Sequence, residues 1–162
     1  MNSGLFKENV ESVAGHCVIT TDVTDVLRQI IADLGAQRVA VSDAPELAGF
    51  GIVPGASDLF DFEVGITKAQ AAIAETGTLV LDSSCERNRL VSVVPPVHIA
   101  IVAASRIYAT LAEVLALLQS GKELSPAITF ITGPSRTADI ELTLTIGVHG
   151  PQELYVIIDE SN

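Results

Sequence analysis

Apolar positions along the chain follow two periods, and each change of period marks the border of an element. After residue 22 they recur three and four positions apart, at Val26, Leu27, Ile30, Ile31 and Leu34. Asp22 precedes this segment in the position of an N-cap, and Gly35 follows it where a left-handed C-cap belongs. The pattern predicts an amphipathic helix between these two caps.

Two capping-box sequences predict the starts of two further helices. In residues 67–70 (TKAQ) and 110–113 (TLAE) a threonine precedes Gln or Glu by three positions, so that both side chains can satisfy early backbone N–H groups. We expect the first helix to end near Glu75 and Gly77, and the second to stop before Gly121. The second is expected to bury four apolar side chains: Leu111, Val114, Leu115 and Leu118.

Short apolar runs predict strands at residues 38–42, 78–81, 97–103, 127–132 and 154–158, with an edge strand at 16–19. The polar residues 1–15 form either a helix or a loose lead-in, and residues 43–63 hold turns and at most one short strand. Strands and helices alternate, which is typical of an α/β fold built on a mostly parallel sheet.

Residues 138–147 fit two interpretations. Apolar and polar residues alternate from Ile140 to Val148, which is strand periodicity. A parallel neighbour at 154–158, however, needs a crossover of about a dozen residues, which is usually helical. Thr137 fits the N-cap of such a helix, with acidic residues in its first turn. We therefore favour a helix over this segment.

The composition narrows the class of protein. The 162 residues are most simply one domain over the whole chain, with residues 1–20 as an N-terminal lead-in, and 48% of them are hydrophobic. A net charge of −11 disfavours nucleic acid and anionic membranes as partners. The N-terminal residues contain no apolar signal region, and no apolar run approaches the ~20 residues of a membrane span, so we expect a cytoplasmic protein.

The cysteines and histidines give little sign of metal chemistry. Cys17 and Cys85 are too few for an iron–sulfur cluster, which normally takes four thiolates, and no metal-ligand spacing accompanies them. We therefore expect no metal site in this chain. Cys85 stands near Arg87 without a Cys–His signature, so a free thiol is the better interpretation. His98 opens an otherwise apolar strand and is expected to be a hydrogen-bonded strand-end residue.

Three glycine turns are candidate sites. In residues 74–78 (AETGT) the acid suits a nucleophile or base, and the alternative is a solvated helix end. Residues 133–137 (GPSRT) follow a strand directly, where hydroxyls, Arg136 and the free N–H groups of a following helix would bind an anion. The alternative there is a loop with a surface arginine. Residues 147–151 (GVHGP) carry His149, which is weak evidence by itself.

Taken together and in order, these motifs resemble the LUD (lactate utilisation domain) family of LutC-like proteins. The similar segments are residues 65–67 (GIT), 72–81 (AIAETGTLVL), 89–92 (RLVS), 95–100 (PPVHIA), 133–141 (GPSRTADIE) and 147–151 (GVHGP). Each motif alone is weak, whereas several in order with similar spacing are specific.

The resemblance implies a three-layer α/β/α fold, similar to the ribose-5-phosphate isomerase and CoA-transferase superfamily. It also implies a role in oxidising L-lactate to pyruvate beside oxidoreductase subunits that carry iron–sulfur clusters, with no cofactor bound by this chain alone. We expect a small anionic metabolite as ligand, and self-association into a homo-oligomer stays open. The alternative is a stand-alone enzyme, an isomerase or acyl/CoA transferase, that acts on an anionic metabolite.

In the first hypothesis Glu75 and His149 are the catalytic candidates, which orient the ligand or move protons. The ligand-binding candidates are Thr76, Gly77, Thr78, Gly133, Ser135, Arg136 and Thr137. If residues 138–147 form a helix of two to three turns, its ends lie ~15 Å apart, at ~1.5 Å per residue. The loops that carry Arg136 and His149 then need not share a pocket, and Arg136 with Glu75 is the stronger combination.

Overall fold

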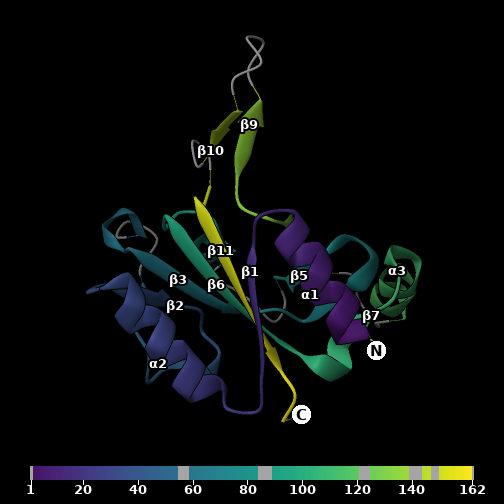
Figure 1. The fold of residues 1–162 in the computed structure, drawn as a ribbon, viewed down its shortest axis with the longest axis horizontal. Coiled ribbons are helices and arrows are strands. Elements are labelled where there is room, and N and C mark those ends of the chain that lie inside the picture. Colours follow the sequence, from purple (N-terminus) through teal and green to yellow (C-terminus); the bar gives the residue numbers. More distant parts are fainter. Residues whose placement is uncertain are drawn as a thin grey trace.

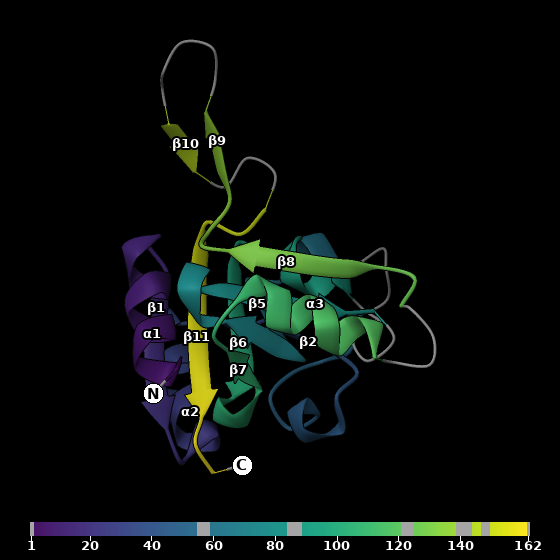
Figure 2. The same cartoon turned by 90° about the vertical axis from the view of Figure 1, so that its right-hand side faces the viewer.

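The described residues form three α-helices, a five-stranded sheet, a four-stranded sheet and a two-stranded hairpin, in a computed structural model (Figures 1 and 2). It describes residues 2–54, 59–83, 89–120, 125–138, 144–146 and 150–161, without the side chains of 137, 138 and 144–146. The helices are α1 (Asn2–Ser12), α2 (Val23–Leu34) and α3 (Leu111–Gln119).

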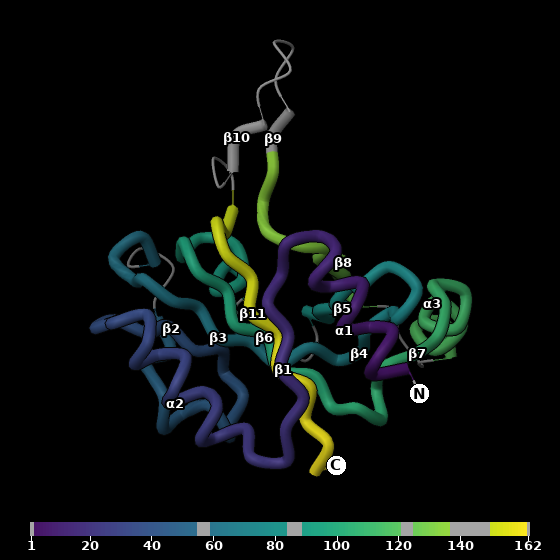
Figure 3. Tube along the Cα trace, in the orientation of Figure 1, coloured from purple at the N-terminus to yellow at the C-terminus, as the bar shows by residue number. Residues whose placement is uncertain are grey.

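The central sheet has five parallel strands in the order β1-β11-β6-β3-β2. Its strands are β1 (His16–Thr20), β2 (Val39–Val41), β3 (Val64–Lys68), β6 (Val97–Ala103) and β11 (Glu153–Asp159). Figure 3 shows β1, β11 and β6 side by side through the middle of the molecule. The predicted α/β fold with a mostly parallel sheet is thereby confirmed, and β1 is the edge strand that the sequence predicts.

A second sheet, with strand order β7-β4-β5-β8, packs against one face of the central sheet. Its strands are β4 (Ala71–Ile73), β5 (Thr78–Asp82), β7 (Ile107–Tyr108) and β8 (Ile128–Thr132). β5 pairs antiparallel with both β4 and β8, whereas β4 and β7 are parallel. Two of the strands predicted from the sequence, at 78–81 and 127–132, therefore belong to a sheet of their own.

Each helix covers a different apolar surface. Leu27 of α2 packs with Val41, Ile66 and Ile99 on the outer face of the central sheet. Helix α1 inserts Phe6 and Val10 into the core between the two sheets. Helix α3 covers the outer face of the second sheet, where Val114 packs with Ala71, Ile73 and Val80.

The caps of α2 and α3 act as the sequence predicts. The Asp22 carboxylate accepts the Asp25 N–H at 3.0 Å, and Gly35 ends α2 with φ at 63°. Thr110 accepts the Glu113 N–H at 3.3 Å. The predicted buried face of α3 is partly wrong, since Leu111 and Leu115 are each 42% exposed, whereas Val114 is fully buried and Leu118 partly buried.

The predicted helix at 67–75 is wrong. Residues 64–68 are β3 and 71–73 are β4, and only residues 74–76 turn, as a short 3₁₀ helix, η3 (Ala74–Thr76). Thr67 bonds to His98 of the neighbouring strand instead of capping a helix. The residues of β3 before Lys68 are buried on both faces, which is typical of a central parallel strand.

The helix favoured over 138–147 is also wrong. Strands β9 (Arg136–Ala138) and β10 (Leu144–Ile146) pair antiparallel as a separate two-stranded sheet, with Arg136 opposite Ile146. Figure 1 shows this hairpin projecting from the body of the molecule. No helical crossover is needed, because β8 and β11 lie in different sheets.

Candidate functional site

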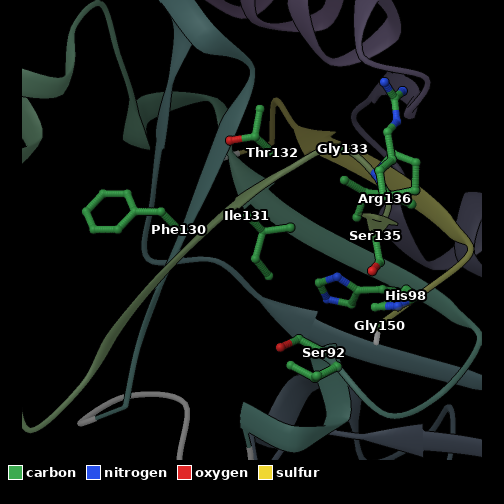
Figure 4. Close-up of a pocket in the computed structure, with 13 residues that line it drawn as sticks. Ser92, His98, Phe130, Ile131, Thr132, Gly133, Ser135, Arg136 and Gly150 are labelled. Carbon is green, nitrogen blue, oxygen red and sulfur yellow. The ribbon is translucent and has the colours of Figure 1, made fainter. Parts of the chain in front are cut away.

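A cavity of about 370 Å³ opens where the amino ends of the central strands meet the end of β8 and the root of the hairpin. This volume lies within the roughly 300–1,000 Å³ of small-molecule pockets. The cavity is lined by Ser92, Val93, His98, Phe130, Ile131, Thr132, Gly133, Pro134, Ser135, Arg136, Gly150, Pro151 and Leu154. Figure 4 shows several of these side chains around the His98 ring.

His98 and Ser92 are the buried polar residues among those described as lining the cavity. His98 is the second residue of β6, it is only 1% exposed, and its ring lies between Ser92 and Ser135 (Figure 4). Its Nε2 is 2.8 Å from Thr67 Oγ1, whereas Nδ1 has no hydrogen-bond partner among the described residues. Burial lowers the pKa of His98 to about 3, so the ring is neutral at pH 7.

A glycine in β3 brings Ser92 to this place. A Cβ at Gly65 would lie 2.0 Å from the carbonyl oxygen of Val91, so only glycine lets this segment rest on β3. The segment is a 3₁₀ turn, η4 (Arg89–Ser92), and the Ser92 hydroxyl donates to the Arg89 carbonyl at 2.7 Å. Gly65 also pairs in register with His98 on the neighbouring strand β6.

Three threonine hydroxyls connect η3 to the cavity. Thr76 Oγ1 lies 2.7 Å from Thr78 Oγ1, which in turn lies 2.7 Å from Thr132 Oγ1 on the neighbouring strand. Thr132 lines the cavity, whereas Thr76 and Thr78 do not. Of the predicted ligand-binding residues in this turn, Thr76 and Thr78 are therefore connected to the cavity through a chain of hydroxyls.

The hairpin root brings together the loop that begins at Gly133 and the loop that ends at Pro151, which the sequence analysis placed apart. The Ser135 N–H donates to the Pro151 carbonyl at 2.8 Å, and Gly133, Ser135, Gly150 and Pro151 all line the cavity. The expected separation of ~15 Å between the two loops is wrong, because the chain folds back as a hairpin. His149 and the side chain of Thr137 lie outside the described residues.

Arg136 lines the cavity with its stem, but its guanidinium extends away from His98 toward α1 (Figure 4). There it donates to the backbone carbonyl of Val13, at 2.5 Å. No helix begins at Thr137, so no helix N-terminus is present to bind an anion. In this arrangement Arg136 fastens the hairpin root to the end of α1.

Glu75 and Gly77 serve the packing of the helices. The exposed Glu75 carboxylate accepts the Leu111 N–H at 2.8 Å, at the start of α3. Gly77 has φ at 63°, and a Cβ there would lie 2.6 Å from the Val10 nitrogen of α1. Asn9 of α1 donates to the Ala74 carbonyl at 2.8 Å. Neither Glu75 nor Gly77 lines the cavity.

The location of the cavity differs from the one expected for the Gly133 loop. That loop follows β8, which is antiparallel to β5, so it does not lie at the carboxyl end of a parallel strand. The carboxyl ends of β3 and β11 instead border a smaller cavity of about 210 Å³, where Lys68 forms an ion pair with Glu46.

Metal and membrane features can be assessed for the residues that the structure describes. Within those residues, His, Cys, Asp and Glu side chains nowhere gather in groups of three able to hold a metal ion. In the same part of the chain, no helix has the length and apolar character that crossing a membrane requires.

The match to a known family spans most of this architecture. The LUD domain family matches residues 56–158, which include His98, the Gly133 loop and the hairpin. The chain belongs to the LUD domain family. A LUD relative from Macrococcus caseolyticus, named lactate utilization protein C, is 32% identical over 161 residues, covering 87% of this chain and 70% of its own length.

Further LUD relatives agree with this assignment. Lactate utilization protein C of Halalkalibacterium halodurans is 40% identical over 103 residues, covering 60% of this chain and 45% of the relative. Among solved structures, a DUF162 family protein from Deinococcus radiodurans has a TM-score of 0.71 at 25% identity, covering 98% of this chain and 96% of its own.

The LUD motifs quoted from the sequence meet at the cavity, although they lie far apart along the chain. Ser92, His98, the residues from Gly133 to Arg136 and the Gly150–Pro151 pair come from four of these motifs. A fifth contributes Thr67 through its bond to His98. Sequence reasoning missed the role of His98, Ser92 and Thr67; the one available signal was a histidine in an otherwise apolar strand.

Proposed function

We propose that this LUD-domain chain takes part in lactate utilisation and binds a small metabolite acid in the His98 cavity. The observation that carries the proposal is the convergence of five LUD motifs on one cavity with a buried polar atom left unpaired. Relatives named lactate utilization protein C support the metabolic role.

The proposal includes partner subunits. Oxidation of lactate to pyruvate releases two electrons and two protons, so an electron acceptor is required. We propose that iron–sulfur oxidoreductase subunits accept these electrons and that this chain binds no cluster of its own. Its two cysteines fall short of the four thiolates that a cluster normally takes.

Growth on lactate tests the role. In a host that lacks its own copy of this gene and cannot grow on lactate, the wild-type chain should restore growth. Ser135→Leu, which places an apolar side chain in the cavity, should fail to do so. Ser161→Leu, at an exposed serine remote from the cavity, is the matched control and should restore growth. No rescue by the wild-type chain would reject the role in lactate utilisation.

The partner proposal has its own test. Co-expressed iron–sulfur subunits should co-purify with the wild-type chain and with Ser161→Leu. Oxidation of lactate by the purified chain alone, with a soluble electron acceptor, would contradict the need for partners. It would favour the stand-alone enzyme instead.

A further inference from the structure

The inner end of the His98 cavity carries no full charge. Among the described residues that line it, Arg136 is the only charged one, and its guanidinium extends toward α1 and Val13. His98 itself is neutral, because burial holds its pKa near 3. An ionised group placed at this end would lose its hydration without gaining a partner, which is strongly unfavourable.

The same end offers one specific hydrogen bond. Thr67 occupies Nε2 of His98, which leaves Nδ1 as the ring atom without a partner among the described residues. A neutral imidazole nitrogen is a donor or an acceptor according to its tautomer, and it suits a hydroxyl or carbonyl oxygen. A buried polar atom without a partner is costly, so a ligand oxygen that reaches Nδ1 gains affinity there.

The outer end of the cavity meets solvent. Phe130 of β8 is 43% exposed, so a ligand can keep a charged group hydrated on this side of the cavity. The cavity therefore has a polarity: an uncharged hydrogen-bonding end at His98 and an open end at Phe130. A molecule that fits both ends has an uncharged oxygen on one side and a charged group on the other.

We infer that His98 Nδ1 recognises the uncharged C2 oxygen of a 2-hydroxy or 2-oxo acid, whose carboxylate remains at the open end. Thr67 is the positioning residue, because its hydroxyl holds the opposite nitrogen of the ring. This inference rests on the proposed function for the class of ligand, a metabolite acid. It adds which group of that acid the site recognises.

Selectivity of the wild-type chain gives the first test. By isothermal titration calorimetry, L-lactate and pyruvate should each bind at least tenfold more tightly than propionate, which has the same carboxylate and carbon chain but no C2 oxygen. A site built to bond an oxygen rejects the analogue that lacks it. Equal binding of propionate, or no binding of either L-lactate or pyruvate, would overturn the inference.

A matched pair of variants assigns the selectivity to Nδ1. In His98→Gln the amide nitrogen replaces Nε2 and nothing replaces Nδ1, so the preference over propionate should fall to within threefold. In His98→Asn the amide nitrogen stands at the place of Nδ1, and the preference should be retained at fivefold or more. The inference is wrong if His98→Gln keeps the full preference.

The tautomer of the His98 ring tests the positioning role of Thr67. ¹⁵N NMR of the imidazole, in a chain with three histidines, should show one dominant tautomer of His98 in the wild type and a mixture in Thr67→Val. Thr67→Ser should restore the single tautomer together with the preference for L-lactate. An unchanged tautomer in Thr67→Val would overturn this role. Should a variant not fold, the propionate comparison on the wild type still decides the inference.

The outcomes separate the two proposals. Rescue of growth on lactate without selectivity for the C2 oxygen would reject the His98 contact and leave the metabolic role intact. Selectivity without rescue would reject the metabolic role and leave the recognition of the acid in place.

Discussion

The turn around Gly77 and the cavity around His98 use the same kinds of residue, namely glycine, hydroxyl-bearing residues and ionisable ones. In the turn every such group has a protein partner: Glu75 bonds to α3, the threonine hydroxyls bond to one another, and Gly77 touches α1. In the cavity one buried atom, Nδ1 of His98, has no partner among the described residues.

The difference lies in hydrogen-bond satisfaction, not in composition. A turn whose polar groups are all paired within the fold contributes to stability and leaves nothing for a ligand. A buried polar atom without a partner, on a side chain that lines a cavity, is destabilising until something binds it. Substitutions in the turn should therefore change stability, and substitutions at His98 should change binding and pH dependence.

The largest effect is expected from Gly77→Ala. The new Cβ would lie 2.6 Å from the Val10 nitrogen and 2.7 Å from the Asn9 carbonyl carbon, both backbone atoms of α1, at a φ of 63°. We expect the free energy of unfolding to fall by about 3 kcal/mol or more in urea titrations. Gly35→Ala is the control, with the same φ and open space, and should cost about 1 kcal/mol. Equal losses would show that α1 is not packed against the turn.

The next effect concerns pH and His98. In the unfolded chain this histidine has a pKa near 6.5, whereas burial lowers it to about 3 in the folded protein. Between these values the unfolded chain binds one more proton, so stability is lost as the pH falls. From pH 7 to 5 the loss due to His98 should be about 2 kcal/mol, measured by urea titration at each pH. His98→Gln should lack this contribution to the pH dependence of stability. A pH profile identical to that of the wild type would contradict a buried neutral ring.

Glu75→Ala should have a moderate effect on stability and none on ligand binding. Removal of the carboxylate leaves the Leu111 N–H at the start of α3 without its acceptor. Loss of such a cap costs about 1 kcal/mol, and Glu75→Gln should recover most of it because the amide oxygen also accepts. A loss of L-lactate binding at unchanged stability would instead restore Glu75 as a catalytic candidate.

Arg136→Ala should have the smallest effect. The exposed guanidinium bonds to a single backbone carbonyl, that of Val13, so the loss in stability should stay below about 1 kcal/mol. Affinity for L-lactate should change by less than threefold, because the charge is directed away from His98. A tenfold loss of affinity would support the anion-pairing role suggested by the sequence.

Most of the fold follows from local signals in the sequence. The caps of α2 and the apolar runs of the strands depend on residues close together in the chain, so they are readable without a structure. The predictions are wrong where residues distant in the sequence determine the local structure. Thr67 lies in a capping-box sequence, but its hydroxyl bonds to His98, 31 positions away. The helix favoured at 138–147 assumed that β8 and β11 share one sheet, and sheet membership is a property of the whole fold.

The candidate site was predictable only in part. The glycine- and proline-containing loop at Gly133 does line the cavity, together with Gly150 and Pro151. The unpaired atom of His98 was not predictable, because an unsatisfied hydrogen bond depends on every neighbour in space. A sequence shows which polar groups exist, but not which of them the fold leaves without a partner.

The hydrogen bond from Ser135 to Pro151 closes the hairpin root, and of the residues that line the cavity only Arg136 and Gly150 lie on the hairpin side of it. Every other lining residue belongs to this pair or to the body of the molecule, whatever length of polypeptide connects β9 to β10. We therefore expect a peptide tag or a fluorescent label inserted between these two strands to leave these residues of the cavity in place.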